Sequence, residues 1–394
     1  MPETSKKPDD KVSFWNDPQK RGIFFQIIAA FFVGAFFYYI VNNALTNMEQ
    51  RGITTGFGFF DKESGFAILQ SLIPYSETDT YGRTFFVGLL NTALVAILGI
   101  FCATILGFSI GIARLSNNWL VSKLASTYIE IFRNIPLLLQ IFFWYFAVLQ
   151  SLPAPRQSLN MADSFFLNVR GLYIPGPILE SGFSVVGFSF LAALIGVFFL
   201  RRYAKKRQAE TGDMIPVGWY SLLLVTAIPG VCFLIMGMPL SWEYPALTGF
   251  NFTGGITIIP ELFALLLALT IYTGAFIAEV VRSGIEAIPD GQTEAASALG
   301  LSEMQRIRLV IIPQAMRVII PPLTNQYLNL TKNSSLATAI GYPDLVSVFM
   351  GTTLNQTGQA IEIIFMTMGV YLTFSLTTSF FMNWYNRHVA LVER

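Results

Sequence analysis

The sequence has few of the residues on which catalysis, metal binding and disulfide bonding depend. It contains two cysteines, Cys102 and Cys232, and one histidine, His388, in 394 residues. Both cysteines lie within apolar runs, which favours packing inside the protein and excludes a disulfide framework or a cysteine-based metal cluster. The histidine lies in a predicted cytoplasmic tail, so a histidine-based triad or metal site within the membrane is excluded too. We expect no bound metal or cofactor and no catalytic activity of this chain's own.

Charged residues are also scarce. They make up 12% of the chain, against 53% hydrophobic residues, whereas soluble domains are about a quarter charged. A glycine-rich turn ending in Gly-Lys-Ser or Gly-Lys-Thr, which would hold the phosphates of ATP, does not occur in the sequence. The composition therefore indicates a membrane protein that binds no ATP, and no nucleic-acid partner is expected.

Eight apolar stretches approach the length of about 20 residues that crosses a bilayer as a helix. They are Ile23–Val41, Phe85–Ala113, Ile135–Leu152, Phe183–Leu200, Trp219–Met236, Leu262–Val281, Val318–Leu330 with its continuation, and Ile363–Met382. The seventh is the weakest because Pro321, Pro322, Asn325 and Asn329 interrupt it. The predicted fold is an all-α polytopic membrane protein with about eight transmembrane helices.

The distribution of lysine and arginine predicts the orientation of these helices. Nineteen basic residues fall in alternate segments beginning with the N-terminal one, and five fall in the segments between them. Because basic residues concentrate on the cytoplasmic side, both termini are predicted to be cytoplasmic, which requires an even number of spans. The cluster Arg201, Arg202, Lys205, Lys206 and Arg207 is interpreted as a stop signal at the inner face, with lipid binding as an alternative.

Four parts are predicted along the chain. Residues 1–84 form a cytoplasmic start, a first helix and an outer segment (42–84) that we interpret as a partly helical cap. Residues 85–152 and 262–394 form two parts of a core. Residues 153–261 contain proline- and glycine-rich outer loops around one pair of spans and are interpreted as an insertion.

A charged loop at residues 290–313 joins two of the late spans. Asp290 is expected to cap a short helix over Gly291–Leu299, and Gly300 to end it. Ser302 and Gln305 have the spacing of a capping box that would start a second short helix, ending at Pro313. Alanines at 295, 296 and 298 would give a smooth face suited to a groove on a partner protein. The plain alternative is a solvated helical hairpin.

This loop resembles the "EAA" loop of the membrane subunits of ABC importers, a coupling helix that inserts into the ATPase subunit. The residues that carry the resemblance are Glu294, Ala295, Ala296, Gly300 and Pro313. Two further blocks, Tyr128–Gln140 and Tyr272–Val346, are similar to polar amino-acid permeases of that class. Asn333 and Ser334 replace the more usual Asp and Thr, which resembles the branch with general L-amino-acid specificity.

The resemblance implies a type I ABC importer permease core, here with an added helix pair and an extra N-terminal helix. It also implies residence in a bacterial inner membrane and three kinds of partner. These are an ATP-binding subunit, a second permease subunit that is similar but not identical, and a periplasmic amino-acid-binding protein. A different class of function, an ion-coupled secondary transporter, remains an alternative, although only Glu279 and Glu362 are acids near membrane depth.

Several polar residues could line a substrate path. Asn91 and Thr92 would either form hydrogen bonds between helices or face that path. Lys332 would either extend to the outer boundary or, with the hydroxyls of Ser334 and Ser335, attract an amino-acid carboxylate.

Two other features of the spans concern pairing and packing. Glu279 is expected to pair with Arg282, with the path as the alternative. Ala103, Gly107 and Gly111, four residues apart, predict a close contact between helices.

Overall fold

The computed structural model describes residues 15, 17–50, 52 and 55–389. Within them, seven helical segments are long and apolar enough to cross a membrane. They are α1 (Pro18–Gln50), α2 (Tyr81–Arg114), α5 (Phe183–Thr211), α6 (Val217–Ile235), α7 (Pro260–Glu286), the composite segment Glu303–Ile340 and α12 (Ala360–Val389). A bent helix pair gives an eighth if it counts as one span. The predicted helical membrane fold with about eight transmembrane helices is confirmed, and residues 1–14 and 16 of the predicted cytoplasmic start lie outside the described ranges.

The bent pair corrects the prediction of a straight third span over Ile135–Leu152. The chain turns by 105° between α3 (Trp119–Asn134) and the segment made of α4 (Leu137–Phe142), the π-helical η2 (Phe143–Val148) and the 3-10 turn η3 (Leu149–Ser151). Ile135 is extended because the residue before a proline avoids the helical conformation. The Gln140 amide then donates hydrogen bonds to the carbonyl oxygens of Phe132 and Ile135, both at 3.0 Å, which fixes the bend.

The prolines of the seventh span do not end it. Helix α9 (Glu303–Arg306) continues through a π-helical turn, η5 (Ile307–Ile311), into α10 (Ile312–Asn333) and a final 3-10 turn, η6 (Ser334–Ile340). The prediction that Pro313 terminates the second short helix is therefore wrong. Pro313 lies in the first turn of α10, where a missing N–H is tolerated, and the wider π turn precedes it.

Small residues allow α2 and α7 to pack closely. A Cβ atom added to Gly107 would lie 2.5 Å from the Cβ of Ile277, and one added to Gly111 would lie 2.7 Å from the carbonyl oxygen of Ala278. The predicted small-residue stripe is confirmed. Cys102, expected to pack inside the protein, is instead exposed on the surface of α2.

The outer loops of the predicted insertion contain β-structure that the sequence prediction missed. A four-stranded sheet has the order β1 (Leu159–Met161), β2 (Phe165–Asn168), β3 (Gly171–Ile174) and β8 (Ile256–Ile258), and every pair is antiparallel. Two hairpin-like pairs accompany it: β4 (Gly176–Leu179) with β5 (Leu240–Glu243), and β6 (Ala246–Thr248) with β7 (Asn251–Thr253). Tyr173 of β3 and Phe252 of β7 are buried against each other, with ring centroids 5.0 Å apart.

The outer segment before α2 is less helical than predicted. Helix α1 extends into it as far as Gln50, but described residues 55–80 form turns and one isolated bridge between Glu63 and Thr80. Phe59 is buried there against Tyr81 and Phe349. Phe349 belongs to a π-helical segment, η7 (Val346–Thr353), which leads through α11 (Leu354–Thr357) to α12. The segment is thus a largely non-helical cover on the outer ends of the helices.

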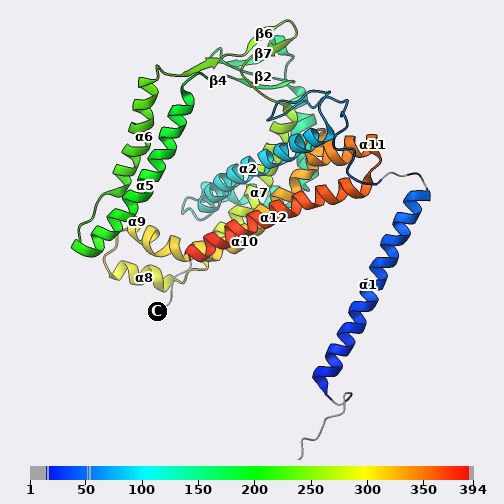
Figure 1. Ribbon diagram of the computed structural model, residues 1–394. Coiled ribbons are helices and arrows are strands. Elements are labelled where there is room, and N and C mark those ends of the chain that lie inside the picture. The colour runs from blue at the N-terminus through cyan, green and yellow to red at the C-terminus, as the bar shows by residue number, and fades with distance from the viewer. Residues whose placement is uncertain (1–14, 16, 51, 53–54, 390–394) are drawn as a thin grey trace, which may run out of the picture.

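The elements are arranged as a bundle with two extensions (Figure 1). Helices α2, α7, α10 and α12 lie together, α1 stands apart from them, and α5 and α6 form a separate hairpin that hangs from the outer β-strands. Helices α8 (Asp290–Ala298) and α9 lie at the end of the bundle opposite the strands, and the described chain ends nearby.

Candidate functional site

Helix α8 has well-defined ends. It begins after Pro289, whose extended conformation starts the helix without a side-chain cap, so Asp290 is its first residue and not the predicted cap. The Asp290 carboxylate still stabilises the N-terminal end of α8, because its negative charge interacts favourably with the helix dipole. At the other end, Gly300 has φ +75°. Its N–H donates to the Ser297 carbonyl (3.0 Å) and the Leu301 N–H to the Ala296 carbonyl (3.2 Å), which confirms the predicted role of Gly300.

The corner between α8 and α9 is held by reciprocal hydrogen bonds. The Gln305 N–H donates to the Ser302 hydroxyl at 3.4 Å, and the Ser302 N–H donates to the Gln305 side-chain oxygen at 2.9 Å. The predicted capping box is therefore present. Gln292 and Gln314 also join through their side chains at 3.1 Å, which ties α8 to α10. These contacts join α8, α9 and α10 at the corner.

The exposed surface of this corner differs from the predicted alanine face. Ala296 is only 2% exposed because it packs inward, whereas Ala295 and Glu294 face outward. The most prominent apolar side chains are Leu299, 81% exposed, and Met304, 73% exposed. We call the surface formed by Glu294, Ala295, Leu299 and Met304 the α8–α9 corner surface. Its exposed apolar side chains are typical of a surface that binds a protein partner.

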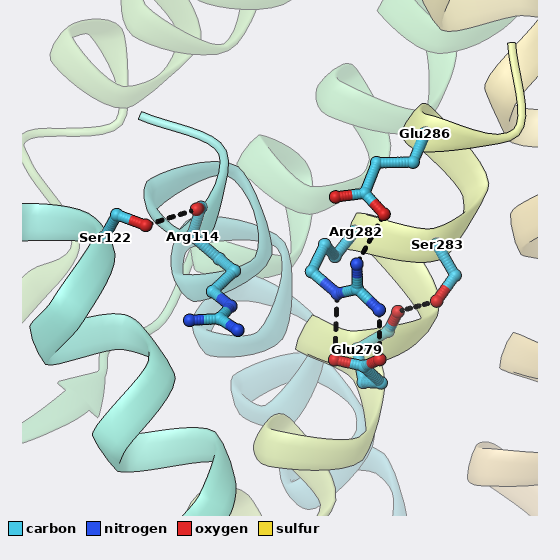
Figure 2. A network of polar contacts seen from close by, with 6 residues as sticks. All are labelled: Arg114, Ser122, Glu279, Arg282, Ser283 and Glu286. Atoms are coloured by element: carbon cyan, nitrogen blue, oxygen red, sulfur yellow. Dashed lines mark hydrogen bonds and ion pairs between the residues drawn. The ribbon is translucent and has the colours of Figure 1, made fainter. Parts of the chain in front are cut away.

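Charged side chains gather where α2, α3 and α7 meet. Arg282 donates through Nε to Glu279 at 3.1 Å and also bonds Glu286, and Arg114 of α2 faces this pair (Figure 2). The predicted pairing of Glu279 with Arg282 is confirmed. Arg114, Glu279 and Arg282 border a cavity of about 210 Å³ that Glu130 and Arg133 also line.

A second, less charged cavity of about 280 Å³ lies between α7 and α10. Its lining residues are Tyr272, Thr273, Phe276, Gln326, Asn329 and Asn333. Sequence analysis did not assign these positions to a substrate path. The available signal was the spacing of three and four residues between the amides of α10, which places Gln326, Asn329 and Asn333 on one helix face. The Arg133 guanidinium stacks 5.1 Å from the Phe276 ring centroid, so the two cavities adjoin.

Asn91 and Thr92 are fully buried and hydrogen-bonded. The Asn91 amide donates to the carbonyl oxygens of Pro343 and Gln70, both at 2.9 Å. Thr92 accepts a hydrogen bond of 3.0 Å from the Leu345 N–H and donates to the Gly88 carbonyl. These two side chains therefore form structural hydrogen bonds, which hold the loop after α10 against α2.

The predicted path residues at the end of α10 point in different directions. Lys332 is exposed. The Ser334 hydroxyl is buried and donates to the Thr331 carbonyl at 2.8 Å, while the Ser335 hydroxyl donates to the Lys332 carbonyl at 2.7 Å. The serine hydroxyls are thus satisfied by the helix backbone, and Lys332 is the one member of this group that remains open to a ligand or a partner.

The loop after α10 carries a buried acid that sequence reasoning missed. Asp344 is 1% exposed and lies between the seventh and eighth spans. Its carboxylate accepts hydrogen bonds from the Ser347 N–H at 2.8 Å and the Tyr371 hydroxyl at 3.3 Å. Burial raises the pKa of Asp344 to about 7. No arginine or lysine among the described residues pairs with it.

The sequence of this chain is similar to those of known transport proteins. Residues 209–391 match the family described as binding-protein-dependent transport system inner membrane component. The chain is 56% identical to the amino-acid ABC transporter permease protein YhdX of Escherichia coli (strain K12), over 97% of each chain. It is 51% identical to the general L-amino acid transport system permease protein AapQ of Rhizobium johnstonii, over 96% of this chain and 94% of that one. It is 42% identical to the glutamate/glutamine/aspartate/asparagine transport system permease protein BztB of Rhodobacter capsulatus, over 96% of each.

Proposed function

Because this chain belongs to the family of binding-protein-dependent transport system inner membrane components and is a permease subunit of an amino-acid ABC importer, we propose that a separate ATPase subunit drives it through the α8–α9 corner surface. The alternative of an ion-coupled secondary transporter finds no support in the family or in the relatives. The observation that carries the proposal is the combination of a hydrogen-bonded corner with a surface exposed at Leu299 and Met304.

Coupling through this corner requires that force reach the spans without being absorbed locally. Helix α9 continues through η5 into α10 without a break. The contact between Gln292 and Gln314 joins α8 to α10 as well. A displacement of α8 by the closing ATPase subunits would therefore move α10. Because α10 packs against α7 and α12, that motion would rock the bundle between inward- and outward-open arrangements. Glu294, Ala295, Ala296, Gly300 and Pro313 are the residues to which we assign coupling.

The substrate path that we propose follows the polar face of α10. Gln326, Asn329 and Asn333 line the cavity beside α7, and Lys332 is exposed next to Asn333. Amide groups can bind the ammonium and carboxylate groups of an amino acid, and an exposed lysine can attract the carboxylate. Ser334, Ser335, Asn91 and Thr92 would support this path through backbone contacts. A second permease chain, similar but not identical, would cover the open side.

The remaining partners and the orientation complete the proposal. A periplasmic amino-acid-binding protein would deliver substrate to the end that carries the β-strands, and the ATPase would bind at the opposite, cytoplasmic end with both termini of the chain. The permease itself would bind no cofactor, and the ATPase partner would hydrolyse ATP. The substrates would be L-amino acids of several kinds, as the names of the relatives AapQ and BztB suggest.

Co-purification in detergent tests this function. We expect an ATP-binding subunit and a second permease to elute with the tagged chain, and ATP hydrolysis by that complex to rise when an amino-acid-loaded binding protein is added. Solute accumulation in vesicles that contain this polypeptide alone would contradict the proposal.

A further inference from the structure

The hairpin of α5 and α6 carries a basic cluster at a defined depth. The apolar part of α5, residues 183–200, spans about 27 Å at 1.5 Å per residue, close to the thickness of the hydrocarbon core. Arg201 follows directly, so the cluster that begins there lies at the level of the lipid headgroups. The cluster lies toward the end of the hairpin that is on the same side as α8 and α9 (Figure 1).

The five cations of this cluster are not equivalent. Lys206 pairs with Glu210 at 3.7 Å and Arg207 pairs with Asp213 at 3.3 Å. Arg201, Arg202 and Lys205 have no acidic partner in the part of the chain that the structure describes. Three positive charges on this turn of α5 therefore have no acidic partner among the described residues.

Two of these unpaired cations border a cavity of about 270 Å³. Arg201, Lys205 and Gln208 of α5 form its polar wall. Met214, Ile215 and Val217, at the turn into α6, form its apolar wall, and Met214 is 83% exposed. The cationic wall is complementary to a phosphate group, and the apolar wall is complementary to hydrocarbon. A molecule that contains both groups would fit this cavity.

We propose that this cavity, called here the α5–α6 basic cavity, binds the headgroup phosphate of an anionic phospholipid. The phosphate lies between Arg201 and Lys205, Gln208 donates a further hydrogen bond, and the glycerol and first methylene groups contact Met214 and Ile215. Anionic lipids of the cytoplasmic leaflet are attracted to basic segments at this depth.

The surroundings of the hairpin agree with a lipid occupant. Helices α5 and α6 pack extensively on each other and stand away from the bundle (Figure 1). The described chain therefore provides little that could cover the cavity. A bound lipid would hold the hairpin at a fixed depth beside the transport core.

The test measures retained lipid by native mass spectrometry of the full-length chain purified in detergent with phosphatidylglycerol. We expect the double substitution R201Q/K205Q to lower bound phosphatidylglycerol about tenfold or more, since each basic residue near the surface contributes to anionic-lipid affinity. Phosphatidylethanolamine, which has no net charge, should be retained less well than phosphatidylglycerol by the unsubstituted chain. Equal retention of the two lipids would overturn the proposal.

A matched variant removes the same charge from the neighbouring positions. K206Q/R207Q should leave phosphatidylglycerol retention within about twofold, because those side chains do not line the cavity and each has an acidic partner. The charge-conserving R201K/K205R should retain the lipid, which separates binding from folding. Equal losses in R201Q/K205Q and K206Q/R207Q, or no loss in either, would overturn the assignment to this cavity.

Inorganic phosphate separates a lipid site from a simple anion site. At a concentration equal to that of the lipid, phosphate should displace little phosphatidylglycerol, because it makes no contact with the apolar wall. Complete displacement at that ratio would show that the cavity binds the anion alone and would overturn the proposed lipid specificity.

Discussion

The amide of Asn91 in α2 donates a hydrogen bond of 2.9 Å to the carbonyl oxygen of Pro343, in the loop beyond α10. A second hydrogen bond from the same amide reaches the Gln70 carbonyl in the outer segment. One side chain thus joins three stretches of the outer end that are distant in sequence, and Tyr342 adds a hydrogen bond back to the Asn91 carbonyl.

Replacing Asn91 with alanine should destabilise the outer end. The buried Pro343 carbonyl would lose its partner, which costs about 1–3 kcal/mol for a buried group left unsatisfied. The thermal unfolding temperature of the purified protein in detergent should fall. The control is Asn47→Ala on exposed α1, where Asn47 bonds only the exposed Asn43 and the change should be within about 0.5 kcal/mol. Equal effects of the two substitutions would contradict the structural role of Asn91.

Replacing Gly107 with alanine should separate α2 from α7. The new Cβ would lie 2.5 Å from Ile277, so the helices would have to shift, at a cost of about 1–3 kcal/mol for overpacking. We expect a lower unfolding temperature and reduced uptake. Gly196→Ala in α5 is the matched control, because no atom lies within 4 Å of the added Cβ. A Gly107 variant as stable as the Gly196 variant would refute this contact.

Asp344 should make stability depend on pH. Its folded-state pKa is about 7, against 3.8 for an unperturbed aspartate. Between these values the folded protein binds more protons at this carboxyl than the unfolded chain does, so the contribution of Asp344 to stability falls as pH rises from about 4 to about 7. Unfolding temperatures measured across this range should decline more steeply for the unsubstituted protein than for Asp344→Asn. Parallel pH profiles would show that the carboxyl does not titrate in this way.

Gly300→Val should abolish coupling between the α8–α9 corner surface and the ATPase subunit. Valine is β-branched and would be strained at φ +75°, by about 1–2 kcal/mol, so the turn between α8 and α9 would rearrange. Uptake should fall to background while insertion into the membrane is unchanged, and Glu294→Lys should have the same effect by reversing an exposed charge. Gly291→Ala, within α8, has no atom within 4 Å of the added Cβ and should transport normally. Normal uptake by either of the first two variants would remove the coupling role.

Lys332→Met and Asn329→Leu should each change the preference among amino acids. The first removes the cation proposed to attract substrate carboxylates, and the second fills the cavity between α7 and α10 with an apolar side chain. Competition between labelled and unlabelled amino acids for uptake measures the preference. Lys123→Met, a substitution in α3 away from that cavity, serves as the control. Unaltered preference in Lys332→Met would exclude that lysine from the path.

Local sequence signals predicted much of the fold and of the coupling loop. Apolar length located the spans, Ser302 and Gln305 predicted the capping box, and the three-residue spacing of Glu279 and Arg282 predicted their ion pair. Each of these features depends on residues that are close together along the chain.

The features that were missed depend on the packing of distant segments. The burial of Asp344 requires Tyr371, and the buried position of Asn91 requires the loop at Pro343. The 105° bend was signalled by Pro136, but its direction depends on contacts of α4 with α7. The strands are three or four residues long, so their pairing could not be read from periodicity alone.

The pairing of β3 with β8 has a consequence for how such a chain could be shortened. Leu172 and Ile258 are direct partners in this sheet, so the polypeptide leaves and re-enters at points about 5 Å apart. A brief linker could bridge those points. The membrane hairpin between them could then be deleted, and its deletion would leave the contact between α2 and α7 unchanged.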